Sequence, residues 1–168
     1  MKPVRTLIFC YDDYRAFSDD VKKNVEGLHR SQVISFLTTE DLLRRIEKEK
    51  GRRTCKIIII GLHESIEHFE MVESLCNQIK MTDPCTGIVL LCPNEMIDDI
   101  KKIIRFNIEA YIPKNANYIL RVTNTVRKLI SEHRIAILKR RRNFTFYCLL
   151  VVVLMTLLSL VFAFFFTK

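Results

Sequence analysis

Two adjacent carboxylates and one distant lysine are the side chains of this sequence best placed to do chemistry together. Asp12 and Asp13 follow the short apolar run 5–11, and Lys114 follows another short apolar run at 109–112. Paired carboxylates can bind a cation, or they can cap the helix that follows them, because acids are favourable at a helix N-terminus. The chemistry of this group therefore depends on the elements that bring the two runs together.

The chain alternates short apolar runs with segments of helical periodicity. The run 56–60 is continuous and β-branched, which is typical of a parallel strand buried on both faces. Phe17, Val21 and Val25 recur at helical spacing, and Thr38 and Thr39 are candidate caps for a second helix. The sequence predicts strands at 5–11, 32–37, 56–60, 87–92 and 109–112, with helices around 17–28, 38–51, 69–79 and 97–104 and from 117 onward.

Five strand–helix units in this order predict an α/β protein with a five-stranded, parallel, doubly wound sheet. In such sheets, functional groups gather at the carboxyl ends of the strands. Those ends carry Asp12 and Asp13 after the first strand, Gly61 after the third, Cys92 at the fourth and Lys114 after the fifth. We therefore expect these five residues at one edge of the sheet.

Residues 4–132 resemble a response-regulator receiver domain, the flavodoxin-like phosphoacceptor module of two-component signalling. The resemblance rests on the acidic doublet Asp12-Asp13 and on the segment 111–114, which reads Tyr-Ile-Pro-Lys. It implies that the acidic pair would hold Mg²⁺, that Lys114 would pair with the phosphoacceptor, and that Tyr111 occupies the position of an aromatic switch residue. In receivers an Asp ends the third strand and accepts the phosphoryl group, and a Ser or Thr follows the fourth strand.

This chain departs from the receiver pattern at the positions that carry the chemistry. Gly61 stands at the acceptor position and has no side chain to phosphorylate, and Cys92 replaces the hydroxyl residue. Pro113 precedes Lys114, whereas receivers usually have the lysine first. We therefore expect a pseudo-receiver that is not an enzyme and has no cofactor, with weak Mg²⁺ binding at Asp12 and Asp13 as the alternative. Without an acceptor, we expect Lys114 to pair with Asp12 or Asp13, and we expect His63 and Glu64 to be solvated loop residues.

The C-terminal 30 residues differ in composition from the rest. Lys and Arg number 27 against 19 Asp and Glu, a net charge of +8, but residues 139–168 hold five cations and no acid, which leaves +3 for the other 138 residues. That near balance argues against a nucleic-acid partner.

The 25 residues 143–167 carry no charge and would span about 37 Å as a helix, more than a bilayer core requires. The sequence predicts a transmembrane helix over 143–167.

The charged flank of this run predicts its orientation. Lys139, Arg140, Arg141 and Arg142 precede the run, and the positive-inside rule places them in the cytosol. They can also attract anionic membrane lipid. We expect a tail-anchored, single-pass protein with a receiver-like domain over 1–132, a basic helix extension over 133–142 and the anchor over 143–167, and we expect the membrane to be a bacterial inner membrane. The six cysteines show no metal-ligand spacing, and we expect no metal–thiolate site.

Two functions remain in view from the sequence. The first is a membrane-anchored module that binds a protein partner, such as a histidine kinase, without phosphorylation. The contact face that the resemblance implies includes Arg105, Phe106, Tyr111 and Arg121. The second is a phosphorelay receiver with an unconventional acceptor carboxylate such as Asp12 or Asp13. A nucleotide-binding enzyme is the weakest reading, because the chain has no glycine-rich phosphate loop.

Overall fold

The computed structural model describes residues 5–12, 17–26, 28, 31–51, 54–62, 66–98, 100 and 108–166, and gives only the backbone of 66–68, 140–141 and 157–166. The chain divides into two units, Met1–Ile130 and Ser131–Lys168. Asp13, His63, Glu64, Arg105 and Phe106 lie outside the described residues, and so does most of the helix predicted around 97–104.

The first unit contains a five-stranded sheet of order β2-β1-β3-β4-β5, and every pair of neighbouring strands is parallel. This confirms the α/β fold predicted from the alternating runs. In the central register, Ile8 of β1 pairs with Val33 of β2 on one side and Ile57 of β3 on the other. The strands are β1 (Thr6–Tyr11), β2 (Ser31–Phe36), β3 (Cys55–Gly61), β4 (Gly87–Cys92) and β5 (Ala110–Pro113).

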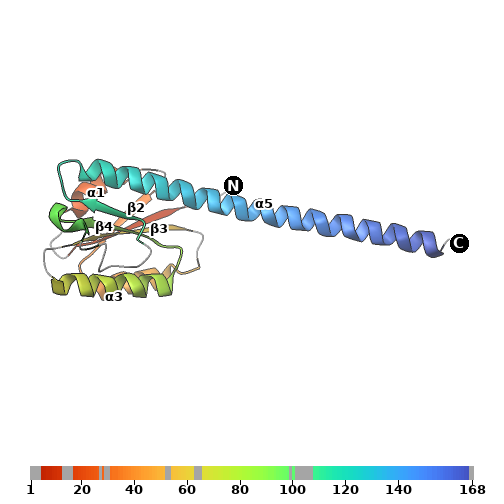
Figure 1. The fold of residues 1–168 in the computed structure, drawn as a ribbon, viewed down its shortest axis with the longest axis horizontal. Coiled ribbons are helices and arrows are strands. Elements are labelled where there is room, and N and C mark those ends of the chain that lie inside the picture. Colours follow the sequence, from red (N-terminus) through yellow and green to blue (C-terminus); the bar gives the residue numbers. More distant parts are fainter. Residues whose placement is uncertain are drawn as a thin grey trace. The chain divides into compact units, whose positions relative to one another are not determined.

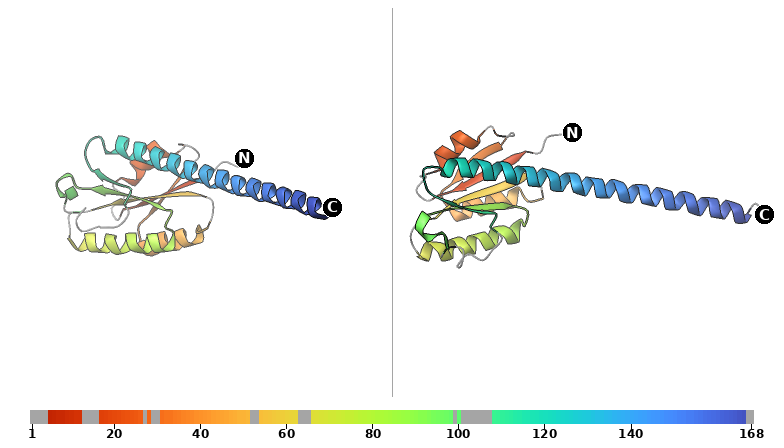
Figure 2. Two further views of the ribbon diagram at one scale, coloured as in Figure 1. Left: turned by 45° about the vertical axis from the view of Figure 1, so that its right-hand side comes forward. Right: turned by 45° about the horizontal axis from the view of Figure 1, so that its top comes forward.

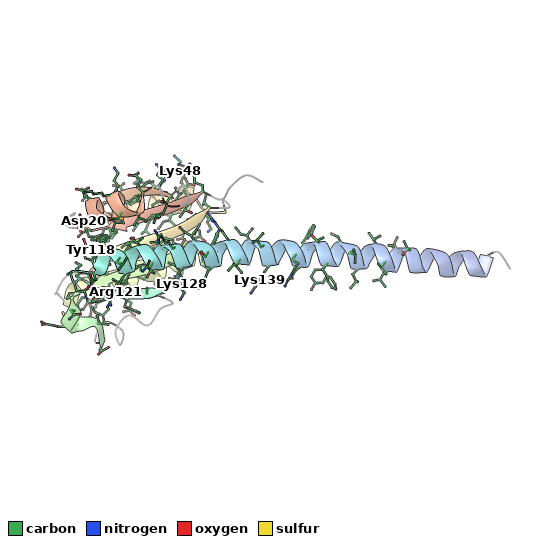
Figure 3. All side chains as sticks on the ribbon, turned by 90° about the horizontal axis from the view of Figure 1, so that it is seen from above. Asp20, Lys48, Tyr118, Arg121, Lys128 and Lys139 are labelled. Atoms are coloured by element: carbon green, nitrogen blue, oxygen red, sulfur yellow. The ribbon has the colours of Figure 1, made fainter. Side chains whose placement is uncertain are left out.

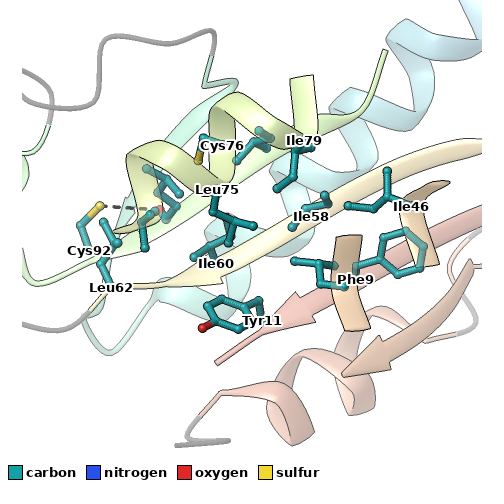
Figure 4. Close-up of a cluster of buried hydrophobic side chains, with 14 of the residues drawn as sticks. Phe9, Tyr11, Ile46, Ile58, Ile60, Leu62, Leu75, Cys76, Ile79 and Cys92 are labelled. Atoms are coloured by element: carbon teal, nitrogen blue, oxygen red, sulfur yellow. Dashed lines mark hydrogen bonds between the residues drawn. The ribbon is translucent and has the colours of Figure 1, made fainter. Parts of the chain in front are cut away.

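Helices cover both faces of the sheet, as Figures 1 and 2 show. On one face, α2 (Thr39–Lys48) and α3 (Ile66–Thr82) pack on alternate strand residues such as Phe9, Ile58 and Ile60 (Figure 4). On the other face, α1 (Ser18–Val25) and the first turns of α5 (Tyr118–Phe166) pack on Ile57, Ile59 and Val89. Because both faces are covered, β1, β3 and β4 are buried along their full lengths, which explains their continuous apolar sequences.

Short local sequence features determine where several helices begin and end. Thr38 caps α2, since its hydroxyl oxygen accepts a hydrogen bond from the Asp41 backbone N–H at 3.4 Å, as the sequence predicted. Gly51 follows α2 with a φ of 73°, a conformation that glycine adopts without strain. Between Pro93 and Ile97 the chain forms a short 3₁₀ turn, η2 (Asn94–Met96).

Two ion pairs lie near the amino ends of the strands. Lys56 at the start of β3 contacts Asp83 at 2.5 Å, and both side chains are largely buried. Lys80 contacts Glu109 at 2.8 Å, and the other Glu109 oxygen accepts a hydrogen bond from the Ile88 backbone N–H. These contacts tie the end of α3 to the starts of β3, β4 and β5.

The second unit consists of the later turns of α5, whose backbone is helical to Phe166. From Phe144 to Met155 its large apolar side chains are exposed. A search of the described residues finds no helix that combines the length and the apolar character needed to cross a bilayer. The side chains of 157–168, nearly half of the predicted span, lie outside the described residues. The fold prediction is thus confirmed for the sheet and not for the transmembrane helix.

Candidate functional site

The carboxyl ends of β1, β3, β4 and β5 form one edge of the sheet and carry the predicted site residues. Asp12 comes directly after β1, Gly61 ends β3, Cys92 ends β4 and Lys114 follows β5. Backbone hydrogen bonds continue the ladder past the strand ends, from Leu62 N–H to the Leu91 carbonyl and from Lys114 N–H to the Cys92 carbonyl, both at 2.8 Å. The structure therefore brings together the four described members of the predicted site.

The position that would hold a phosphoacceptor side chain is filled by the ring of Phe17. A Cβ atom built on Gly61 would lie 2.6 Å from Cε1 and 3.2 Å from Cδ1 of Phe17, and 3.5 Å from Oδ1 of Asp12. Phe17 is only 3% exposed, so its ring has little room to move aside. The helical spacing of Phe17 predicts only its place at the start of α1, and no local signal predicts this contact, since the two residues lie 44 positions apart.

Asp12 caps the start of α1. Its Oδ2 accepts a hydrogen bond from the Phe17 backbone N–H at 3.2 Å, and Phe17 is the residue that immediately precedes α1. Asp12 is buried, with 2% of the residue exposed. Of the two roles left open for the acidic doublet, this contact favours the cap for Asp12, and it also holds Phe17 over Gly61.

Lys114 donates a hydrogen bond from Nζ to the carbonyl oxygen of Leu62 at 2.9 Å. The hydrogen-bond partner of the ammonium is thus a backbone carbonyl beyond the end of β3, and the pairing with the acidic doublet stays a prediction. Burial lowers the pKa of Lys114, while the charge of Asp12 and the neighbouring Cys92 act in the opposite direction. Asp12 thus contributes charge to the surroundings of Lys114.

Cys92 and Tyr111 are both turned toward the sheet face that α2 and α3 cover. The Cys92 thiol is fully buried and donates a weak hydrogen bond to the Leu90 carbonyl at 3.8 Å (Figure 4). Tyr111 is half-buried and packs against the same apolar cluster. Burial raises the pKa of Tyr111, and the nearby thiols of Cys92 and Cys76 add to the shift. Both side chains therefore act as packing groups in this structure.

A small cavity of about 180 Å³ lies beside this edge, lined by Phe17, Lys114, Asn115 and Tyr118. The Tyr118 hydroxyl donates a hydrogen bond to Oδ2 of Asp20 at 2.9 Å, which links α5 to α1 (Figure 3). Burial and this hydrogen bond to Asp20 raise the pKa of Tyr118 to about 12. The phenol therefore stays protonated at neutral pH and serves as a structural donor.

The described residues do not fit the Mg²⁺ site that the receiver resemblance implies. Mg²⁺ needs oxygen ligands in near-ideal octahedral geometry. Gly61 offers no side-chain oxygen, and the Phe17 ring occupies the space beside Asp12 where such a ligand would stand. Within the described ranges, no three Asp, Glu, His or Cys side chains gather in a way that could hold a metal ion.

Among known proteins, only solved structures are similar to this chain, and the similarity concerns the fold. No protein-family model matches the sequence, and no curated protein matches it either. Among solved structures, the chain is similar to the signal receiver domain of a putative LuxO repressor protein from Vibrio parahaemolyticus, with a TM-score of 0.62, 19% identity, and coverage of 80% of this chain and 97% of that one.

Two further structures agree with this likeness. A response-regulator receiver domain protein from Clostridium thermocellum matches with a TM-score of 0.59 and 15% identity over 78% of this chain and 98% of that one. A CheY-like protein, TadZ, from Pseudomonas aeruginosa PAO1 matches with a TM-score of 0.57 and 13% identity over 75% and 94%. The chain therefore has the fold of response-regulator receiver domains.

Proposed function

We propose that this chain is a receiver-like signalling module that acts by binding a protein partner, without accepting a phosphoryl group and without catalysis. The contact between Phe17 and Gly61 carries the proposal. Phosphoryl transfer to a receiver requires a carboxylate nucleophile, and here an apolar ring fills the place where that carboxylate would stand.

The rest of the site supports the same function. Asp12 is engaged with the Phe17 backbone N–H, and Lys114 with the Leu62 carbonyl, so the two charged groups hold loops together. The first contact joins the end of β1 to the start of α1, and the second joins the ends of β3 and β5, which together give a fixed surface for a partner. A histidine kinase or another signalling protein is the class of partner that the fold favours, and the exposed Arg121 lies on the face proposed for it.

Membrane attachment is the second part of the proposal, and the sequence supports it. The uncharged run 143–167 is long enough to span a bilayer, and Lys139–Arg142 precede it. In this proposal the domain lies on the cytosolic side of a bacterial inner membrane, and the basic run lies among anionic lipid headgroups.

Phosphorylation of the full-length chain tests the first part. Chain reconstituted in phospholipid vesicles is incubated with Mg²⁺ and acetyl phosphate, beside a conventional receiver domain as the positive control. We expect the control to gain base-labile phosphate and this chain to gain none. Stoichiometric labelling that is lost on Asp12→Asn or Asp13→Asn would contradict the proposal and favour a phosphorelay receiver, as would a phosphoryl adduct on an aspartate of protein recovered from cells.

Alkaline carbonate extraction tests the second part. We expect the full-length chain to stay with the membrane pellet, because an apolar transmembrane helix is not displaced by high pH. A chain ending at residue 138 is the matched control and should be released. Release of the full-length chain would overturn the anchor.

A further inference from the structure

A groove of about 330 Å³ lies between α2 and α3. Its described lining is apolar at Leu43, Met71 and Leu75 and polar at Thr39, Glu40, Ser74 and Gln78. Met71 is 39% exposed. An open groove lined by a flexible, exposed methionine is suited to aliphatic side chains from another helix.

The described lining of this groove carries one charge, and it is negative. That charge belongs to Glu40. Glu47 lies two turns further along the same face of α2, and both glutamates are exposed. The arginines of α2 are directed to other acids, Arg44 to Asp41 at 3.8 Å and Arg45 to Glu49 at 3.2 Å. The groove therefore favours a basic occupant.

A surface of complementary character exists in the second unit. Ile135 and Leu138 are 51% and 55% exposed and lie one helical turn apart on α5. Residues 131–142 include five cations, among them Arg134 and Lys139 on either side of this pair, and one acid, Glu132. The turn thus presents two aliphatic side chains within a basic helix.

We propose that the α2–α3 groove of one copy receives the Ile135–Leu138 turn of a second copy. Pairing of two such turns with each other is disfavoured, because it would bring Arg134 of one copy close to Arg134 of the other. Each copy offers one groove and one turn, so two copies can pair reciprocally and a chain of copies can also extend.

This inference rests on the proposed membrane anchor. Ile135 precedes Asn143 by eight residues, about 12 Å along a helix, whereas the headgroup region on one side of a bilayer is about 5 to 8 Å thick. The isoleucine of an anchored chain would therefore lie beyond the headgroups, where lipid does not cover it. A contact of two side chains is small and weak in dilute solution, but attachment to one membrane raises the effective concentration of the partner.

Disulfide cross-linking in vesicles tests the contact. The exposed Cys85 and Cys148 are first replaced by serine in the full-length chain. One preparation then carries Met71→Cys and another carries Ile135→Cys, and the two are reconstituted together and oxidised. We expect a mixed dimer that joins position 71 to position 135. The matched control replaces Met81, which lies on the same helix and is 80% exposed but does not line the groove, and it should give several-fold less mixed dimer.

Charge exchange gives a second readout. Glu40→Arg should reduce the cross-link several-fold, and Arg134→Glu in the partner preparation should restore part of it. Equal cross-linking from positions 71 and 81 would overturn the inference, and so would dimers that form mainly between two copies of position 135. Carbonate extraction is measured on the same vesicles. A chain that stays in the membrane but gives no selective cross-link overturns this inference alone. A chain that carbonate extracts overturns the anchor and this inference with it.

Discussion

Phe17 and Gly61 exclude each other's side chains at the carboxyl edge of the sheet, because a Cβ on Gly61 would lie 2.6 Å from Cε1 of the Phe17 ring. The missing side chain at position 61 and the position of the Phe17 ring are therefore one structural feature. A carboxylate introduced at position 61 alone would meet this ring.

The two positions should be energetically coupled. Gly61→Ala should lower the free energy of unfolding by about 1–3 kcal/mol, as overpacking of a core does. In a Phe17→Ala background the same change should cost almost nothing, because the clashing ring is gone. Urea unfolding of the four chains in mild detergent, followed by circular dichroism, measures the coupling.

A second glycine serves as the control for this cycle. A Cβ on Gly87 would meet Leu129 Cδ1 at 3.3 Å and has no contact with Phe17. Gly87→Ala should therefore have the same effect with or without Phe17. Additive effects of Phe17→Ala and Gly61→Ala would refute the exclusion.

The buried ion pair between Lys56 and Asp83 should make the free energy of unfolding depend on pH in the acid range. Burial acts to raise the pKa of Asp83, but the hydrogen bond and charge of Lys56 outweigh it, and the pKa is lowered. A carboxyl whose folded pKa is depressed contributes stability above its unfolded pKa of about 3.9, and that contribution is lost as pH falls from there through the folded pKa. Urea midpoints should therefore fall as pH drops below about 4.

Removal of one partner of this pair should cost more than removal of both. Lys56→Met leaves the Asp83 carboxylate without its cation and should cost about 3–5 kcal/mol at pH 7. The double variant Lys56→Met with Asp83→Asn should recover part of that loss, and its stability should no longer show the Asp83 contribution below pH 4. Equal losses in the single and double variants would show that the pair is not coupled.

Thiol reactivity should separate buried, exposed and membrane-covered cysteines. Burial raises the pKa of both Cys10 and Cys76 to about 12, so their reactive thiolate forms are scarce at neutral pH. Cys85 is exposed in the domain, and Cys148 lies within the proposed anchor. A membrane-impermeant maleimide should label Cys85 alone in intact vesicles and all six cysteines after denaturation. Rapid labelling of Cys148 in intact vesicles would contradict the anchor.

The central strand should not tolerate charge. Ile58 and Ile60 on β3 are fully buried, and an Asp at either position would be a buried charge without a partner. We expect Ile58→Asp and Ile60→Asp each to lower the free energy of unfolding by several kcal/mol. A loss above about 4 kcal/mol is typical of a buried charge without a partner. Leu37→Asp, at a residue that is 46% exposed, is the control and should change the unfolding midpoint little.

The architecture could be predicted from sequence because its signals are local. The β-branched run 56–60 became the core of β3, and Thr38 became the cap of α2. Each of these depends on a few neighbouring residues, whose apolar spacing or capping oxygen acts within one element. The predicted strand bounds differ from the observed ones by about one residue at most ends, the usual uncertainty of element boundaries.

The sequence could predict which residues lie at the site but not the contacts that they make. The amino-acid identity of Gly61 was enough to indicate that the ordinary acceptor is absent, because a glycine in any fold has no carboxylate. The sequence did not indicate that the Phe17 ring fills the space, or that Lys114 bonds to the Leu62 carbonyl 52 residues away. Those contacts depend on strand register and on the packing of α1 against the sheet, which are set by the whole core and not by the spacing of residues along the chain.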